Sequence, residues 1–152
     1  MTHEDYMRKA IALALKVPAF PFGAVIVNRA TGRIVAEGYN LSALNPAFHG
    51  EMVAINNCAE LRHPADWSGL DLYTTAEPCP MCQSAIIWAG IDCVYYGTSI
   101  PYLQDHNWRQ INIRASAVLA QSPFSNCKIV GGILEAECNA LFDKGPDSFY
   151  HN

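Results

Sequence analysis

Residues 70–96 read LDLYTTAEPCPMCQSAIIWAGIDCVYY, and their pattern gives the strongest indication of the fold class. Its first part, residues 70–75, alternates as a strand does, and the prolines on either side of Cys79 predict that a helix begins there. Gly90 is a residue type typical of helix ends, and residues 91–96 again have the composition of a strand. A strand, a helix and a second strand in this order predict a layered α/β fold.

The same kinds of pattern predict the elements on either side of this stretch. Before it we expect a helix over residues 4–16, a hairpin of strands over 22–27 and 33–40, a loop over 41–48 and a helix over 51–61. After it we expect irregular chain over residues 98–112, a helix over 113–120, a short strand over 128–131 and a closing helix over 134–142. Strands that alternate with helices after a hairpin predict a mixed sheet.

The composition indicates how many domains the chain forms, what it binds and where in the cell it is expected. A chain of 152 residues, 51% of them hydrophobic, predicts one domain over residues 1–152. Charged residues make up 16%, against about 25% in a typical soluble domain, which predicts a homo-oligomer with a subunit interface. The net charge is −4 and the basic residues are scattered, so a duplex-binding protein is not expected. The start of the chain is acidic, unlike a signal peptide, and no stretch is apolar enough to span a membrane, so we expect a cytoplasmic protein.

Two of the six cysteines lie three residues apart where the helix after residue 75 begins. Cys79 and Cys82 can turn their sulfurs to one face of the first helical turn, and a helix N-terminus favours the thiolate form that binds metals. His49 precedes the helix over 51–61, so its imidazole can approach the same point. Two thiolates and one imidazole neutralise Zn²⁺ and leave a fourth position for water, as in catalytic zinc sites.

A carboxylate beside such a zinc ion is needed to take and return protons, and Glu51 is the candidate. Residues two apart on an ideal helix point about 200° apart. His49 and Glu51 can therefore serve one site only if His49 lies at the cap position, outside the regular helix.

Other uses of these residues have to be compared with the catalytic one. Cys79 and Cys82 alone are also typical of a thioredoxin-type redox pair. A structural zinc site would recruit a fourth ligand, for which His63, His106 and Cys93 are available. The remaining cysteines, including Cys93, have apolar neighbours typical of buried packing. A His-x-Glu motif followed by Pro-Cys-x-x-Cys is more specific than either motif alone and resembles the signature of zinc-dependent base deaminases.

With these motifs the chain resembles the cytidine deaminase superfamily, in the branch of tRNA adenosine, guanine and fungal-type cytosine deaminases. The matching stretches are PFGAV at 21–25, GYN at 38–40, HGE at 49–51, LYTT at 72–75 and EPCPMC at 77–82. The resemblance implies a three-layer α/β/α cytidine deaminase-like fold with a central mixed five-stranded sheet, and a dimer or tetramer, of which we expect the dimer. It also implies one Zn²⁺ per chain, held by His49, Cys79 and Cys82.

The mechanism that the resemblance implies is hydrolytic deamination. Hydroxide on the zinc attacks the ring carbon that bears the amine, Glu51 moves the protons, and ammonia is released. Asn40 occupies the position where the family uses an asparagine to hydrogen-bond the base, although asparagine is also common in turns. Aromatic rings are expected to sandwich the base, and the candidates are Phe22, Phe48, Trp108, Phe149 and Tyr150.

The expected substrate is a free nucleobase or nucleoside, a small heterocycle similar to cytosine or guanine. The middle residue of the His-x-Glu motif is Gly50, which resembles the motif of the fungal-type cytosine deaminases. The tRNA adenosine and guanine deaminases usually have alanine at this position. Asp147 begins an acidic-aromatic tail that could close over a small base, and a frayed terminus is the alternative. The acidic balance argues against tRNA, although a local patch around Arg109 and Arg114 would fit it. The alternatives are a tRNA-specific adenosine deaminase and a non-catalytic zinc-binding interaction module.

Overall fold

The computed structural model describes residues 1–62 and 66–146 of the chain. Its helices and strands follow in the order α1 (His3–Ala14), β1 (Gly23–Asn28), β2 (Arg33–Tyr39), α2 (Gly50–Arg62), β3 (Leu70–Ala76), α3 (Pro80–Ala89), β4 (Cys93–Thr98), α4 (Ile100–Asp105), α5 (Ala115–Ala120), β5 (Lys128–Val130) and α6 (Glu135–Phe142).

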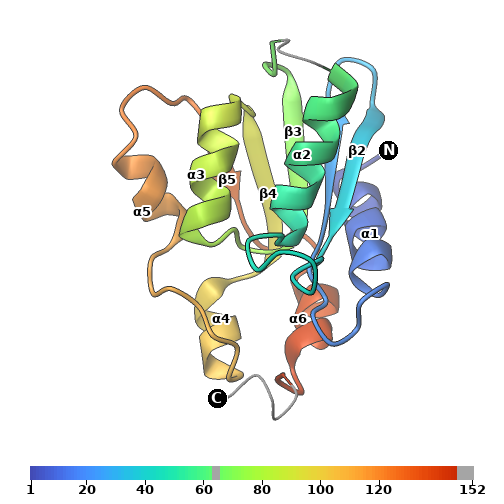
Figure 1. Cartoon of the computed structure of the whole chain (residues 1–152), viewed down its shortest axis with the longest axis vertical. Coiled ribbons are helices and arrows are strands. Elements are labelled where there is room, and N and C mark those ends of the chain that lie inside the picture. Colours follow the sequence, from blue (N-terminus) through green and yellow to red (C-terminus); the bar gives the residue numbers. More distant parts are fainter. Residues whose placement is uncertain (63–65, 147–152) are drawn as a thin grey trace.

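The five strands form one mixed sheet in the order β2-β1-β3-β4-β5, as Figure 1 shows. The β1 strand pairs antiparallel with both β2 and β3, whereas β3, β4 and β5 run parallel. The prediction of a mixed five-stranded sheet is confirmed.

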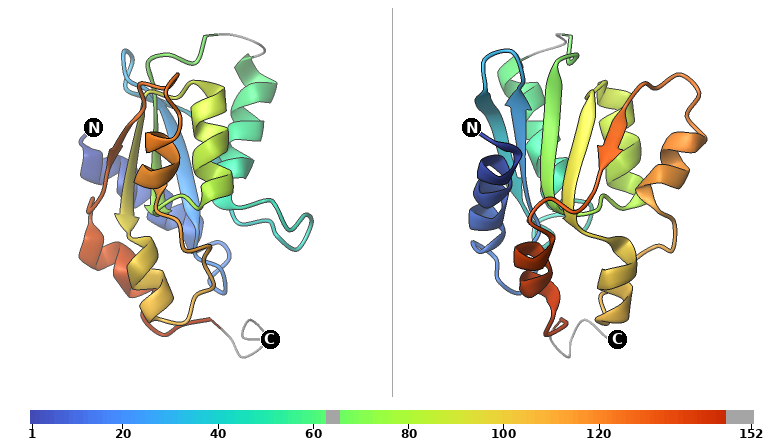
Figure 2. Two further views of the ribbon diagram at one scale, coloured as in Figure 1. Left: turned by 90° about the vertical axis from the view of Figure 1, so that its left-hand side faces the viewer. Right: turned by 180° about the vertical axis from the view of Figure 1, so that it is seen from behind.

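Helices cover both faces of this sheet. Figure 2 shows α2 and α3 on one face and α1 and α6 on the other. Along β1, Ala24 and Ile26 contribute to the core under α2 and α3, while Val25 and Val27 contribute to the core under α1. This alternation follows from the two-residue period of a strand. The predicted three-layer α/β/α architecture is confirmed.

Two glycines have particular roles at α2 and α3: one allows α2 to lie close to β2, and the other ends α3. A Cβ atom at Gly38 in β2 would overlap with backbone atoms of Ala54 and Gly50 in α2, so only glycine allows this helix to lie so close to the strand. Gly90 ends α3 with φ +84°, in the left-handed region that other residues rarely adopt.

One predicted element is wrong: residues 98–112 are not irregular throughout, because α4 occupies part of this range. Ser99 caps the helix by accepting a hydrogen bond from the Tyr102 backbone N–H, and Ile100 and Leu103 are buried. Pro101 argued against a helix in the sequence, because proline breaks the interior of a helix. In the structure it lies in the first turn, where proline is well tolerated. Within the described ranges, no helix is both long and apolar enough to cross a membrane.

Candidate metal centre

The structure brings together His49, Cys79 and Cys82 from two segments on one side of the sheet. His49 directly precedes α2, and its carbonyl accepts the hydrogen bond of the Val53 N–H, so it lies at the cap position outside the regular helix. Cys79 is the N-cap of α3 and Cys82 lies in its first turn. The condition that allows His49 and Glu51 to serve one site is therefore met.

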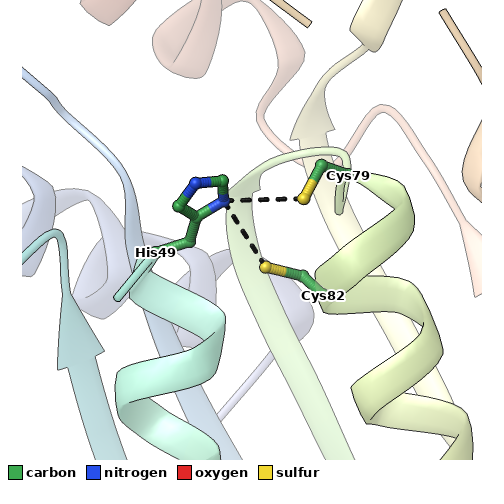
Figure 3. A group of neighbouring side chains, drawn as sticks. All are labelled: His49, Cys79 and Cys82. Carbon is green, nitrogen blue, oxygen red and sulfur yellow. Dashed lines mark hydrogen bonds between the residues drawn. The ribbon is translucent and has the colours of Figure 1, made fainter. Parts of the chain in front are cut away.

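The three side chains point toward one another, as Figure 3 shows. The His49 Nδ1 atom lies 3.5 Å from the Cys79 Sγ atom and 3.7 Å from the Cys82 Sγ atom. Zn–S bonds of about 2.3 Å and Zn–N bonds of about 2.0 Å at tetrahedral angles place sulfur and nitrogen about 3.5 Å apart. The donor types and their separations therefore fit zinc.

No fourth ligand joins this group among the described residues. His106 is elsewhere, with its Nδ1 atom 2.8 Å from the Tyr102 carbonyl, and Cys93 lies in β4 outside the group. His63, the third alternative ligand, lies outside the described residues. A three-donor set favours a catalytic zinc over a structural one.

The close contacts shift the proton affinities of the three donors. A hydrogen bond from the Cys82 thiol, helped by the His49 ring, lowers the pKa of Cys79 to about 4. The same hydrogen bond, together with burial, raises the pKa of Cys82, and the contact with Cys79 raises the pKa of His49. Without metal, the Cys79 sulfur is therefore a thiolate at neutral pH, which is the form that binds zinc.

Glu51 lies in the first turn of α2 and is 4% exposed. Burial, with the negative charge of Cys79 as the second cause, raises its pKa to about 7. Its carboxyl is close enough to Cys79 and His49 for their charges to act on it, yet it is not a member of the donor group. The structure thus supplies a buried, non-ligating carboxyl group that can exchange a proton near neutral pH.

A cavity of about 750 Å³ opens beside the donor group. His49 and Cys79 form part of its wall, as do the predicted substrate contacts Asn40 and Phe22. The Asn40 Oδ1 atom accepts hydrogen bonds from the Ser42 backbone N–H at 3.1 Å and from the Ser42 hydroxyl at 2.7 Å. No described residue accepts a hydrogen bond from the Asn40 Nδ2 group, so this assignment of the amide leaves its donors for a ligand.

Two of the predicted aromatic contacts, Trp108 and Phe48, are not among the residues that line the cavity. Trp108 is 4% exposed, packs in a core cluster with Phe142, and donates its indole N–H to the Phe142 carbonyl at 2.9 Å. Phe48 is partly exposed and does not line the cavity. Both rings were predicted from residue type, and an aromatic ring suits a core as well as a ligand site. Three further candidates, Asp147, Phe149 and Tyr150, lie outside the described residues.

Several wall residues were missed by the sequence reasoning. A second aromatic ring, Phe20, stands beside Phe22, and Met81 lies between the two cysteines. Three further lining residues, Arg109, Gln110 and Ile111, come from the connection between α4 and α5. The motif around Cys79 predicts Met81, and the sequence named Arg109 only as part of a basic patch that would fit tRNA. No local pattern places the other residues at the cavity, because only the folded chain brings them there.

The family comparison covers the part of the chain that carries the donor group. Residues 1–98 match the model of the cytidine and deoxycytidylate deaminase zinc-binding region. All three donors and Glu51 fall within this range.

Curated relatives with two different substrates are similar to this chain. Guanine deaminase of Bacillus subtilis (strain 168) is 40% identical over 102 residues, which cover 63% of this chain and 64% of that protein, just under two thirds. The tRNA-specific adenosine deaminase of Rickettsia bellii (strain RML369-C) is 33% identical over 146 residues, covering 91% and 95%. A solved structure from a study of A-to-I editing by tRNA:A34 deaminases superposes with a TM-score of 0.77 at 26% identity, covering 91% of this chain and 99% of that one.

Proposed function

The chain belongs to the cytidine and deoxycytidylate deaminase family, whose members are zinc-dependent hydrolytic deaminases, and from that premise we propose that it deaminates a free nucleobase or nucleoside. The observation that carries the proposal is the group of His49, Cys79 and Cys82 beside the buried Glu51. This group lies at a cavity that Asn40 also lines. An aromatic base with an exocyclic amine has the C–N bond that such a site hydrolyses.

In this proposal His49, Cys79 and Cys82 hold one zinc ion per chain. The imidazole binds through Nδ1, the nitrogen that faces both sulfurs. When bound, zinc lowers the pKa of a coordinated water from about 15.7 towards 7 and so supplies a nucleophile at neutral pH.

Glu51 carries the protons. Its carboxylate takes one proton from the attacking water and delivers it to a ring nitrogen as the C–O bond forms. It then takes the second proton from the new hydroxyl group on the ring carbon and gives it to the exocyclic amine, so that the C–N bond breaks, ammonia leaves and the carbonyl group of the product forms. The pKa of about 7 supports this role, because a group with a pKa near the working pH can both accept and donate a proton.

Asn40 and Phe22 hold the base in place. Since Ser42 occupies the Oδ1 atom of Asn40, the Nδ2 group is the part that donates to a carbonyl or ring nitrogen of the substrate. Phe22 is braced by Trp108, with the ring centroids 5.7 Å apart in an edge-to-face arrangement, and offers an aromatic surface against which a base can stack.

Three observations support a small substrate. The net charge is −4, and Arg109 is the single Arg or Lys among the described residues along the cavity. A protein that binds tRNA normally presents several basic side chains to the phosphates. The similarity to guanine deaminase points in the same direction.

A tRNA adenosine deaminase is the second candidate. The observation that favours it is the length of the match, since the Rickettsia bellii enzyme aligns over more than nine tenths of both chains. The cavity also accepts more than a free base, because its volume of about 750 Å³ exceeds that of one heterocycle several times.

The first experiment measures zinc content and ammonia release on the same protein samples. The panel consists of cytosine, guanine, adenine, their nucleosides, and a tRNA anticodon stem-loop containing adenosine. We expect about one zinc per chain and release from a free base or nucleoside. Release from the stem-loop alone would replace the proposal with the second candidate.

The matched variant is Glu51→Ala. We expect it to keep its zinc, because Glu51 is not a donor, and to lose turnover by at least about 10²-fold, the usual contribution of a general acid–base group. An active Glu51→Ala variant would contradict the proposed proton transfer. Zinc in both proteins with no release from any substrate would favour the non-catalytic zinc-binding module.

A further inference from the structure

Glu77 is a buried carboxylate that the proposed mechanism does not use. It follows β3 directly, and its side chain is 2% exposed. Its Oε1 atom accepts the Ile100 backbone N–H at 2.9 Å, and its Oε2 atom accepts the Ala115 backbone N–H at 2.9 Å. The Arg114 Nε atom donates to both oxygens at 3.0 Å.

These contacts tie three distant parts of the chain to one point. Ile100 is the first residue of α4 and Ala115 the first residue of α5, where backbone N–H groups lack partners within the helix. The Glu77 backbone N–H donates to the Thr98 carbonyl at 2.7 Å, which fixes Glu77 against the end of β4. Cys79 lies two residues further along. One carboxylate thus connects the cysteine segment with both ends of residues 100–115.

The middle of that segment forms part of the wall of the cavity that His49 and Cys79 also line. Arg109, Gln110 and Ile111 lie along the cavity, in a stretch without helix or strand. At one end of the stretch the wall is held by the buried Trp108 and its hydrogen bond to the Phe142 carbonyl. At the other end it is held through Glu77.

We propose that Glu77 is a positioning residue that sets the wall formed by residues 109–111 relative to Cys79 and thereby determines how tightly the substrate binds. The proposal rests on the proposed deaminase function and adds to it the residue that shapes the cavity. Glu77 acts through the backbone of the wall and touches no substrate.

A carboxylate is required at this position. Both oxygens face N–H donors, so replacing either oxygen by an amide NH₂ group sets a donor against a donor. The Arg114 guanidinium would also lose its counter-charge. Glu77→Gln changes the side-chain volume very little, so its effects report these lost contacts.

Asp71 provides the matched control at the opposite end of the same strand. Its side chain is 6% exposed, and its two oxygens accept hydrogen bonds from Arg29 at 3.0 and 3.1 Å. Asp71 belongs to neither the cavity wall nor the donor group. Asp71→Asn therefore removes a similar buried ion pair that has no connection to residues 109–111.

The experiment compares the zinc-loaded wild type with the two variants by steady-state kinetics and by hydrogen exchange. For Glu77→Gln we expect KM to rise at least about fivefold, the effect of losing one buried hydrogen bond, while kcat stays within about twofold. We also expect faster amide exchange over residues 106–114 and unchanged zinc content. For Asp71→Asn we expect a lower Tm with unchanged KM and unchanged exchange over 106–114.

Three results would overturn the proposal: equal KM values in the two variants, unchanged exchange over 106–114 in Glu77→Gln, or loss of zinc from that variant, which would place its effect on Cys79. If Glu77→Gln does not fold, Arg114→Gln replaces it, because the Arg114 side chain is 47% exposed. The same changes are then expected with smaller size, and their absence overturns the proposal. If the wild type deaminates nothing, the proposed function fails, and hydrogen exchange alone decides whether Glu77 anchors the wall.

Discussion

At the scale of single residues, hydrogen bonds from Ser42 fix the orientation of the Asn40 side-chain amide. Ser42 donates two hydrogen bonds to its Oδ1 atom, and Asn40 lines the cavity, so we expect its amide donors to serve a ligand there. We expect Asn40→Ala to lower kcat/KM roughly 5- to 150-fold, which corresponds to about 1–3 kcal/mol of lost transition-state binding. The reason is that a buried acceptor on the base would lose its hydrogen-bond donor. Kinetics and thermal unfolding of the same variant measure this.

Asn28→Ala is the control for Asn40→Ala. Asn28 ends β1, where its Oδ1 atom accepts the Ala30 backbone N–H at 3.0 Å, and neither Asn28 nor Ala30 lines the cavity. It should affect stability but not kcat/KM. A lower Tm with unchanged kcat/KM in Asn40→Ala would assign Asn40 a turn role only.

The cysteines differ sharply in their proton affinities, which predicts selective alkylation. In the metal-free protein the pKa of Cys79 is lowered to about 4, so at pH 6–7 this group is already deprotonated. Burial raises the pKa of Cys127 to about 11 and that of Cys138 to about 12, so both remain thiols. After chelation, iodoacetamide at pH 6.5 is expected to modify Cys79 first, as measured by peptide mass spectrometry.

Zinc provides the control for the alkylation. Adding one equivalent before iodoacetamide should protect Cys79, because the metal occupies the reactive thiolate. Equal modification of Cys79 and Cys127 in the chelated protein would contradict the lowered pKa.

At the scale of helices and strands, the close packing of α2 on β2 places His49 and Glu51. We expect Gly38→Ala to destabilise the protein by about 1–3 kcal/mol or more, because the new methyl group overlaps with the α2 backbone and no flexible side chain can yield. The helix must move to make room, so zinc content should fall as well. Thermal unfolding and metal analysis measure the two effects.

Gly90→Ala is the matched change at the end of α3. A Cβ atom there meets nothing within 4 Å, so the expected cost, about 1–2 kcal/mol, comes only from the positive φ. Zinc content should not change. If Gly38→Ala retained its zinc while losing stability, the position of α2 would not control the metal centre.

At the scale of the whole molecule, the low charge content still predicts a homo-oligomer, with a dimer expected. The side chains of Trp88 and Phe124 support this prediction, since they are 78% and 61% exposed and their ring centroids lie 5.1 Å apart. Light scattering at micromolar concentration is expected to give twice the mass of one chain. A mass of 16.7 kDa would contradict it.

The sequence also predicted features that the structure does not test. The assignment of residues 1–152 to one domain and the cytoplasmic location stay predictions. So do the roles of the site residues, which depend on the experiments above.

Local patterns in the sequence were sufficient for the framework. The apolar, β-branched run at residues 22–27 predicted the strand that became β1, and Gly90 predicted the end of α3. The spacing of Cys79 and Cys82 and the cap position of His49 predicted the donor group, because one helical turn and one helix start determine where these side chains point.

Only the tertiary structure decided which residues complete the cavity. Trp108 is a core residue, whereas Arg109, the next residue in the sequence, lines the cavity. This difference depends on where α6 packs and on how Glu77 holds residues 100–115. Glu77 stood in the quoted motif without a predicted role, since its partners lie 23 and 38 residues away. Local preferences determine helices and strands, whereas contacts between distant segments exist only after the chain has folded.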